Sequence, residues 1–263
     1  MTIFHLSVKT ISRSKGRSAT AAAAYRSGSR IYDKRTGLTF NYRKKEGVNY
    51  TKIFGWAGSR QTLWNKVELT EKRKNSCVAR EIEFALPVNI STKKRVDIAE
   101  EFCQQVAKRY QIAGEMAIHH IHSNNPHCHF LMTTRKIRDG NFTEKTRILD
   151  CKQSGPIEVE ALRHAWANAV NAALEESNLH ERVEHRSYKR QGIAKIPSKH
   201  LGPTASALEK KSPGSSEKNE KIALLRTLKK QLSKIQKEIR KLKTTLLNKA
   251  CTMQKTSSQL TNK

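Results

Sequence analysis

The chain has 263 residues, enough to bury a full hydrophobic core as one large domain or as one domain with an extension. Its 51 Lys and Arg residues against 23 Asp and Glu residues give a formal net charge of +28, which favours a polyanionic partner, with nucleic acid as the first candidate. No run approaches the roughly 18 apolar residues of a membrane span, and residues 1–13 lack the apolar core of a signal peptide, so we expect neither membrane insertion nor export.

On charge alone, a packing protein of ribosomes or chromatin fits as well as an enzyme that acts on nucleic acid.

The five cysteines are scattered and form no C-x-x-C pair. That distribution suits a reducing cytosol better than a disulfide scaffold or a structural zinc site. We therefore expect a cytoplasmic protein.

The start of the chain predicts a strand followed by a helix. Residues 3–9 alternate apolar and polar side chains, as a half-buried strand does, and SKGRS (14–18) is typical of a turn. Residues 19–30 predict a helix because they are rich in alanine and follow Ser18, a good N-cap. Further along, the patterns predict a short β element (35–43), a helix (61–73), a strand (79–87), a helix (91–110), two strands joined by a turn (115–122 and 127–137) and a helix (157–178).

Strands interleaved with helices, with neighbouring strands joined by short turns, predict an α/β sandwich whose sheet is largely antiparallel. Composition further divides the chain into four parts. We predict a folded domain over 1–209, a linker over 210–220, a heptad-patterned helix over 221–250 and a polar tail over 251–263.

The predicted C-terminal helix carries two apolar rows with a seven-residue period. They are Leu225, Leu232, Ile239 and Leu246 in one row and Leu228, Ile235 and Leu242 in the other. Such a helix can pair as a coiled coil or pack on DNA. About three heptads are a borderline length for a stable pair. Self-association through 221–250 and packing on DNA therefore both stay open as expectations.

The segment IHHIHSNNPHCHF (118–130) carries the strongest chemical signal. His127 and His129 are two residues apart on a predicted strand and therefore share one face. The SNNP turn folds the preceding strand back beside this one, which brings His119 alongside them. Three imidazoles on one sheet face make a divalent-metal site with open positions for substrate oxygens. Histidines solvated on a hairpin or hydrogen-bonded in the core are the alternative, and they explain this spacing less well.

Tyr25 stands in AAAAYRSG (21–28), among residues that are mostly small. Facing a metal that polarises a phosphodiester, its hydroxyl can attack phosphorus and form a covalent 5′-phosphotyrosine. The small neighbours leave space for a DNA backbone, and Arg26 and Arg30 add positive charge near it. The alternative is a tyrosine of the hydrophobic core.

Four segments, in this order, resemble the MobA/MobL family of plasmid mobilisation relaxases, which are DNA-nicking enzymes with a His-hydrophobe-His motif. The segments are MTIFHLSVKTISRSKGRSATAAAAYRSGSRI, LWNKVE…EKRKNSCVAREIEFALP, NPHCHF and RVEHRSYKRQG…IPSKHLGP. The resemblance covers about residues 1–210, and its one mild departure is Cys128 in the hydrophobe position.

The resemblance assigns roles to four residues. Tyr25 matches the nucleophile of the family, and His119, His127 and His129 match its metal ligands. It also implies a two-layer sandwich with a central five-stranded antiparallel sheet, and Mg²⁺ or Mn²⁺ as the working metal. By ligand chemistry alone, three histidines suit zinc better than magnesium.

The activity that the resemblance implies is site- and strand-specific nicking at a plasmid transfer origin, bound as a single strand plus a hairpin, with later rejoining of the strand. The implied partners are accessory mobilisation proteins and a coupling protein of a type IV secretion system. A rolling-circle replication initiator shares the chemistry, although the N-terminal tyrosine and the LWN…ARE block favour mobilisation. A non-catalytic DNA-binding module is the third reading.

Two further groups of residues are candidates for the site. Glu83 is the acidic residue that we expect to support the histidines, but Glu81 lies on the same strand face, and either carboxylate can pair with a lysine instead. The basic stretch RVEHRSYKRQG (182–192) suits phosphate contacts and base stacking, with a solvated loop as its alternative. The candidate DNA-binding residues in it are Arg186, Tyr188, Lys189 and Arg190.

Overall fold

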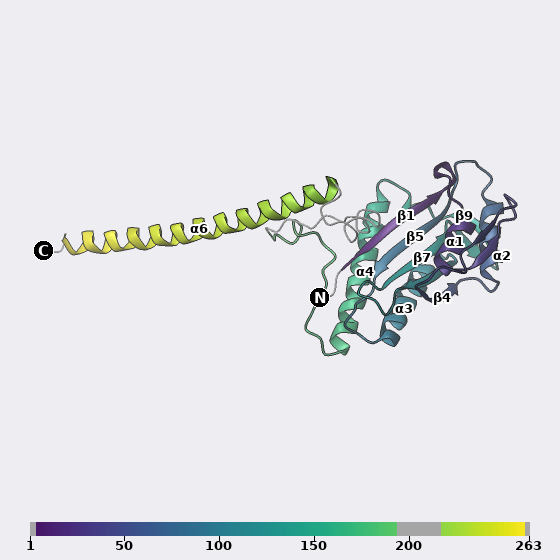
Figure 1. Ribbon diagram of the computed structural model, residues 1–263, viewed down its shortest axis with the longest axis horizontal. Coiled ribbons are helices and arrows are strands. Elements are labelled where there is room, and N and C mark those ends of the chain that lie inside the picture. The colour runs from purple at the N-terminus through teal and green to yellow at the C-terminus, as the bar shows by residue number, and fades with distance from the viewer. Residues whose placement is uncertain (1–3, 194–216, 261–263) are drawn as a thin grey trace. The chain divides into compact units, whose positions relative to one another are not determined.

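The centre of the fold is a five-stranded sheet in which every neighbouring pair of strands is antiparallel (Figure 1). In the computed structural model, which describes residues 4–193 and 217–260, the strand order is β1-β5-β7-β6-β4. These strands are β1 (Leu6–Ser12), β5 (Cys77–Ala85), β7 (His127–Thr133), β6 (Gly114–His119) and β4 (Val48–Phe54). The predicted α/β fold with a central antiparallel sheet is confirmed.

Two long helices, α3 (Thr92–Tyr110) and α4 (Ser154–Glu176), cover one face of the sheet (Figure 1). The Ser91 side chain accepts the Lys94 N–H and so caps the start of α3. Apolar side chains of alternate strand positions meet the two helices in the main core, where the Phe84 ring lies 4.4 Å from that of Trp166 and 5.2 Å from that of Phe102, measured between centroids. This core makes the sheet a rigid base for the opposite face.

The opposite face is covered in part by α1 (Ala19–Ser27) and α2 (Arg60–Thr70). Alanine methyl groups of α1 are buried there against Leu131 of β7 and Trp64 of α2. Because methyl groups are small, the backbone of α1 lies close to the sheet. This packing brings the end of α1 to the strands that carry the histidines.

The helix predicted over 19–30 ends earlier, at Ser27. Gly28 follows in the left-handed conformation with φ 59°, and its N–H donates to the Ala24 carbonyl. The chain then enters a hairpin of β2 (Arg30–Tyr32) and β3 (Thr39–Asn41), where the sequence predicted a single β element over 35–43.

The structure differs from the predicted secondary structure in two other places. The sequence analysis predicted no element over β4, which pairs with β6 at the edge of the sheet. The strand predicted over 127–137 consists of β7 and β8 (Arg135–Arg138), and β8 pairs with β9 (Asn141–Lys145) in a separate hairpin. Two short 3-10 turns lie at Arg13–Lys15 and Arg147–Leu149.

The chain divides into two compact units, 1–185 and 186–263. The second unit contains α6 (Glu217–Leu260), which includes the helix predicted over 221–250 and the first part of the tail predicted over 251–263. The boundary predicted at residues 209–210 and most of the predicted linker lie outside the described residues, so this division stays a prediction. Among the helices of the described ranges, none has the length and apolar character that a membrane crossing requires.

Candidate active site

Three histidines converge on the sheet face that carries α1. Antiparallel pairing of β6 with β7 sets His119 opposite His127 and Ala117 opposite His129. The centroids of the three imidazole rings lie 4.7–5.4 Å apart, and one nitrogen of each ring lies within 4.8 Å of the others. The structure therefore brings together the three residues that the sequence singled out, at a spacing that fits one metal ion.

The hydrogen bonds of the three rings leave the second nitrogen of His127 and of His129 open to a metal, whereas that of His119, Nδ1, lies 3.5 Å from the Lys45 ammonium, which a metal ion would displace. Each ring donates an N–H to a fixed oxygen: His119 Nε2 to the Arg26 carbonyl (2.6 Å), His127 Nδ1 to the Asn125 carbonyl (2.9 Å) and His129 Nδ1 to Glu81 Oε1 (2.7 Å). In the neutral form of such a ring, the other nitrogen carries a lone pair. Metal-ligating histidines typically have such an acceptor behind them, so this donor set fits a bound cation.

Burial keeps the imidazoles of His119 and His127 in the form that binds metals. It lowers the pKa of His119 to about 3, and the positive charge of Lys45 acts in the same direction. Burial also lowers the pKa of His127. Both rings are therefore neutral at pH 7, as metal coordination requires.

Of the two candidate carboxylates, Glu81 is the one that bonds to a histidine. Burial alone would raise the pKa of Glu81, but hydrogen bonds from Arg26 and His129 hold it well below its usual value, so the buried carboxylate is ionised. Glu83 lies opposite His129 in the strand register, yet its carboxylate is paired with Lys9 of β1. The sequence analysis named Glu83 for this role without a pattern that separated it from Glu81, and in the structure Glu81 makes the contact with His129 instead.

Tyr25 lies on the last turn of α1 with 48% of its surface exposed, so it is not a core tyrosine. Its ring packs edge-on against that of Tyr42, with centroids 5.2 Å apart. The Lys45 ammonium lies 4.0 Å from the centre of the Tyr25 ring and 3.5 Å from His119 Nδ1. One cation therefore touches both the tyrosine and the histidine cluster.

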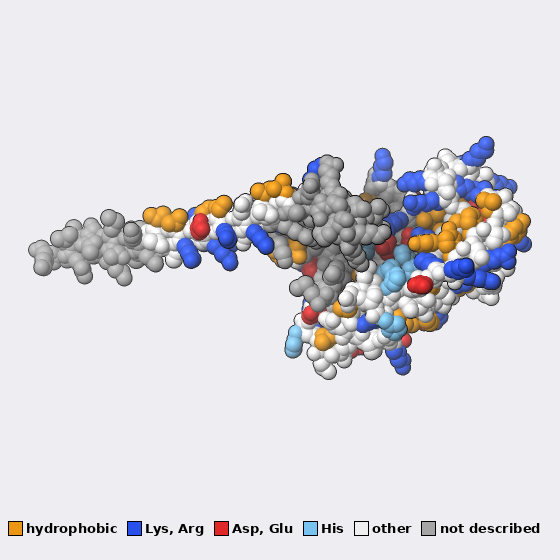
Figure 2. Space-filling model, in the orientation of Figure 1, with side chains coloured by type: hydrophobic (Ala, Val, Ile, Leu, Met, Phe, Trp, Pro, Cys, Tyr) orange, Lys and Arg blue, Asp and Glu red, His pale blue; other side chains and the backbone are white. Residues whose placement is uncertain are grey.

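The sequence analysis did not identify Lys45 as a site residue, because it lies in a run of basic residues with no distinctive pattern. Burial lowers its pKa to about 8, and the charge of Arg26 adds to that effect. Figure 2 shows histidine side chains at the surface of the molecule with both basic and acidic side chains beside them. The Lys45 ammonium beside Tyr25 and His119 suits an anionic ligand.

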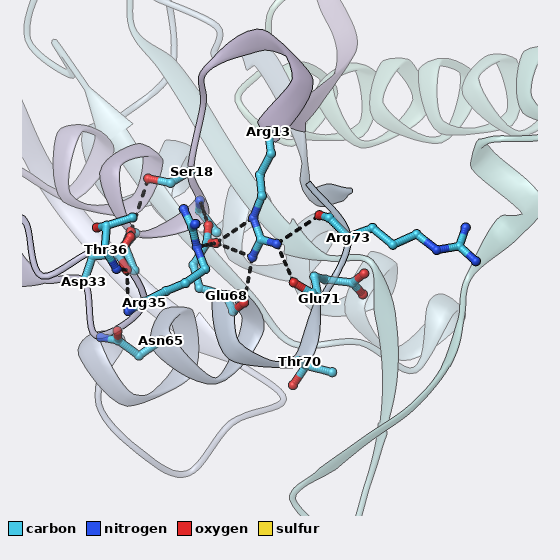
Figure 3. A network of polar contacts seen from close by, with 12 residues as sticks. Arg13, Ser18, Asp33, Arg35, Thr36, Asn65, Glu68, Thr70, Glu71 and Arg73 are labelled. Atoms are coloured by element: carbon cyan, nitrogen blue, oxygen red, sulfur yellow. Dashed lines mark hydrogen bonds and ion pairs between the residues drawn. The ribbon is translucent and has the colours of Figure 1, made fainter. Parts of the chain in front are cut away.

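A buried network fixes the start of the helix that carries Tyr25 (Figure 3). Glu68 of α2 is fully buried and accepts the Ala19 N–H at 2.6 Å, so it satisfies one of the free N–H groups at the start of α1. Arg13 Nη2 donates to the same carboxylate at 2.6 Å, and Arg35 Nε donates at 2.9 Å. Two arginines thus hold the carboxylate that holds α1.

The six residues expected to contact DNA are placed in three different ways. The Arg26 guanidinium is bound to Glu81 and is mostly buried, so it supports the site from within. Arg30 is exposed on β2. The remaining four lie in the second unit around a turn near residue 189: Arg186, Tyr188, Lys189 and Arg190. The IPSKHLGP segment lies outside the described residues.

Comparison with known proteins matches residues 17–211 to the MobA/MobL family. The mobilization protein MobL of Acidithiobacillus ferridurans is 35% identical, over 81% of this chain and 65% of that protein. Mobilization protein A of Escherichia coli is 31% identical, over 80% of this chain and 30% of that protein, so the chain spans less than two thirds of either relative. A solved structure described as "Molecular Basis of Vancomycin Resistance Transfer in Staphylococcus aureus" has a TM-score of 0.64 and 31% identity, and the match covers 71% of this chain and 100% of that one.

Proposed function

The chain belongs to the MobA/MobL family, and we propose that it is a plasmid mobilisation relaxase that nicks one DNA strand at a transfer origin. The observation that carries the proposal is the convergence of three histidines, each with an oxygen behind one ring nitrogen, at the helix that holds an exposed tyrosine. Transesterification of a phosphodiester needs this pair of features, an activated phosphate and an accessible nucleophile.

The proposed reaction uses Tyr25 as the nucleophile. Its hydroxyl loses its proton and attacks the scissile phosphorus, and the bond from phosphorus to the 3′ oxygen breaks. The 3′ oxygen takes up a proton and leaves as a 3′ hydroxyl, and the 5′ end of the strand stays on the protein as a phosphotyrosine. The Lys45 ammonium over the ring stabilises the negative charge that develops on the phenol oxygen. Because the covalent link conserves the bond energy, the strand can be rejoined later without ATP.

We propose that His119, His127 and His129 hold a divalent ion and that Glu81 fixes the ring of His129. When bound, this ion would polarise the scissile phosphate. The family resemblance favours Mg²⁺ or Mn²⁺, whereas three nitrogen donors favour zinc. Calorimetric titration of the metal-free chain with each of the three ions ranks them.

The proposed substrate is origin DNA presented as a single strand plus a hairpin. A net charge of +28 supports it, since Lys and Arg supply most of the affinity for nucleic acid. Exposed Arg30 offers a phosphate contact near Tyr25 on the chain. We assign the same role to the basic turn of the second unit, with Tyr188 as a stacking ring for a base.

Accessory mobilisation proteins and the coupling protein of a type IV secretion system are the proposed partners, and the cytoplasm is the proposed location. A transfer origin is a cytoplasmic substrate, and a nicked strand held on a protein must be handed to a transport machine to leave the cell. Pull-down of the tagged chain from a cell that carries the plasmid and its secretion system tests both partners.

The decisive experiment compares two tyrosines of nearly equal exposure, Tyr25 at 48% and Tyr32 at 46%. With Mg²⁺ or Mn²⁺, the wild type should convert supercoiled origin plasmid to open circles with protein on the 5′ end. Tyr25→Phe should lose nicking and keep DNA binding, and Tyr32→Phe should keep both. His127→Ala should lose nicking and metal affinity together.

Mass spectrometry of the adduct with an origin oligonucleotide identifies the linked residue. Normal nicking by Tyr25→Phe refutes the mechanism, and DNA binding by a wild type that never nicks makes the chain a binding module.

A further inference from the structure

The α6 helix of the second unit carries a long apolar row. Figure 2 shows hydrophobic side chains along one side of this helix and Lys and Arg side chains along the other. The row consists of Leu225, Leu228, Leu232, Ile235, Ile239, Leu242 and Leu246, whose exposed fractions lie between 46% and 65%. A continuous apolar row of this length on a protein surface marks an interaction site.

The spacing of the row specifies what covers it. Its residues are separated alternately by three and four positions from 225 to 246, which is the a/d pattern of a coiled coil. A strict seven-residue repeat keeps such a row turned toward a partner helix that winds around it with a left-handed twist. We propose that α6 pairs in parallel and in register with α6 of a second copy of this chain.

The charges beside the row favour the parallel orientation. In a parallel pair, each g position faces the e position five residues later on the partner helix. Glu238 occupies a g position and Lys243 is the matching e residue, so by symmetry two Glu–Lys pairs form. The preceding pair consists of Gln231 and Gln236, which are uncharged. Between 225 and 246, the parallel pair thus sets no like charges against each other at these positions.

An antiparallel pair lacks this agreement. There, e positions face e positions, and in the register that overlaps the row fully Lys243 lies against Lys229 of the partner helix. Such like-charge contacts destabilise the pair. The parallel arrangement is therefore the one that the sequence of α6 supports.

DNA is the other candidate occupant, and it explains less of the pattern. Phosphates would bind the cationic side of α6, where Lys230, Lys237 and Arg240 lie, and would leave the Leu and Ile row uncovered. Pairing with a second α6 covers that row and leaves the cationic sides outward. The pairing would place two copies of the N-terminal unit in one particle, and it does not depend on the proposed nicking activity.

The test is sedimentation equilibrium of the full chain, wild type and variants, at tens of micromolar. Lys243→Glu turns both Glu–Lys pairs into Glu–Glu pairs, which should raise the dimer Kd by about tenfold. Lys237→Glu is the matched control, because it makes the same charge change at an outward f position and should leave the Kd unchanged or slightly lower. The double variant Glu238→Lys with Lys243→Glu should restore the wild-type Kd.

Ile235→Asp removes an apolar d residue and should abolish the association, and circular dichroism checks that each variant keeps its helix content. A wild type that stays monomeric throughout the range overturns the proposal. So does a Lys243→Glu variant that associates as well as Lys237→Glu or better, because that result excludes the parallel pair. Association that survives Ile235→Asp would place the contact elsewhere and likewise overturn it.

Discussion

Glu81 and Glu83 provide a matched pair for testing how the site is held together. Both are glutamates on the same face of β5, two residues apart, but only Glu81 bonds to His129 and to the Arg26 guanidinium. Replacing Glu81 with Gln keeps an oxygen that can accept the His129 N–H. It removes the negative charge that Arg26 faces. If the Gln oxygen accepts from His129, the amide N–H₂ points at the Arg26 guanidinium, and if the oxygen faces Arg26 instead, the His129 N–H has no acceptor.

The magnitude follows from burial. The side chains of Arg26 and Glu81 are 17% and 3% exposed, so Glu81→Gln should cost about 3 kcal/mol of unfolding free energy, at the low end for breaking a buried ion pair because Arg26 keeps some water. Lys9 and Glu83 are 50% and 25% exposed, so Glu83→Gln should cost less than about 1 kcal/mol. Loss of the negative charge behind His129 should also weaken metal binding about tenfold in Glu81→Gln.

Urea unfolding of the metal-free variants measures the first difference, and calorimetric titration with Mn²⁺ measures the second. We expect Glu83→Gln to stay close to the wild type in both. If the two variants lose equal stability and equal metal affinity, the assignment of Glu81 as the residue that supports the histidines is wrong. A larger effect in Glu83→Gln would transfer that role to Glu83.

Two further predictions concern stability. Glu68→Gln should cost about 3–5 kcal/mol, because fully buried Glu68 neutralises a nearly buried arginine, whereas the exposed Glu144→Gln should change little; equal urea midpoints would contradict this. Burial lowers the pKa of His119 to about 3, against about 6.5 in the unfolded chain, so the unfolded state binds more protons below pH 6.5 and stability falls as the pH drops. Between pH 7 and pH 5 the metal-free chain should lose about 1–2 kcal/mol through this residue. His119→Gln should show a correspondingly smaller loss, and an unchanged pH dependence would contradict the account.

The sheet could be predicted where sequence pattern and turn chemistry agree. The β6–β7 hairpin has alternating apolar residues on both sides of an SNNP turn, so its register and the shared face of its histidines follow from the sequence. The edge strand β4 lacks that alternation: VNYTKIF mixes half-buried and exposed positions. Its conformation depends on hydrogen bonding to β6, where Tyr50 pairs with Ile118, and no local pattern reports such a contact.

The supporting residues of the site could not be predicted for a related reason. A strand places Glu81 and Glu83 on one face without distinguishing them. The distinction comes from side chains that distant segments bring in, Arg26 of α1 and Lys9 of β1. Lys45 likewise acquires its position over Tyr25 only when the loop after β3 folds back onto α1.

Arg26 explains why the tyrosine and the histidines keep one geometry. Its carbonyl lies in the last turn of α1, where carbonyls lack helical partners, and it accepts the His119 N–H. Its guanidinium binds Glu81, which binds His129. The residue next to Tyr25 is thus joined to two of the three histidines by separate routes. A backbone carbonyl can reach a strand side chain at 2.6 Å only if the helix lies close to the sheet, and the buried alanines of α1 allow that approach. A larger side chain at one of them would move α1 outward and weaken both connections at once, so the buried alanines that directly precede Tyr25, Ala22, Ala23 and Ala24, are part of what sets its distance from the three histidines.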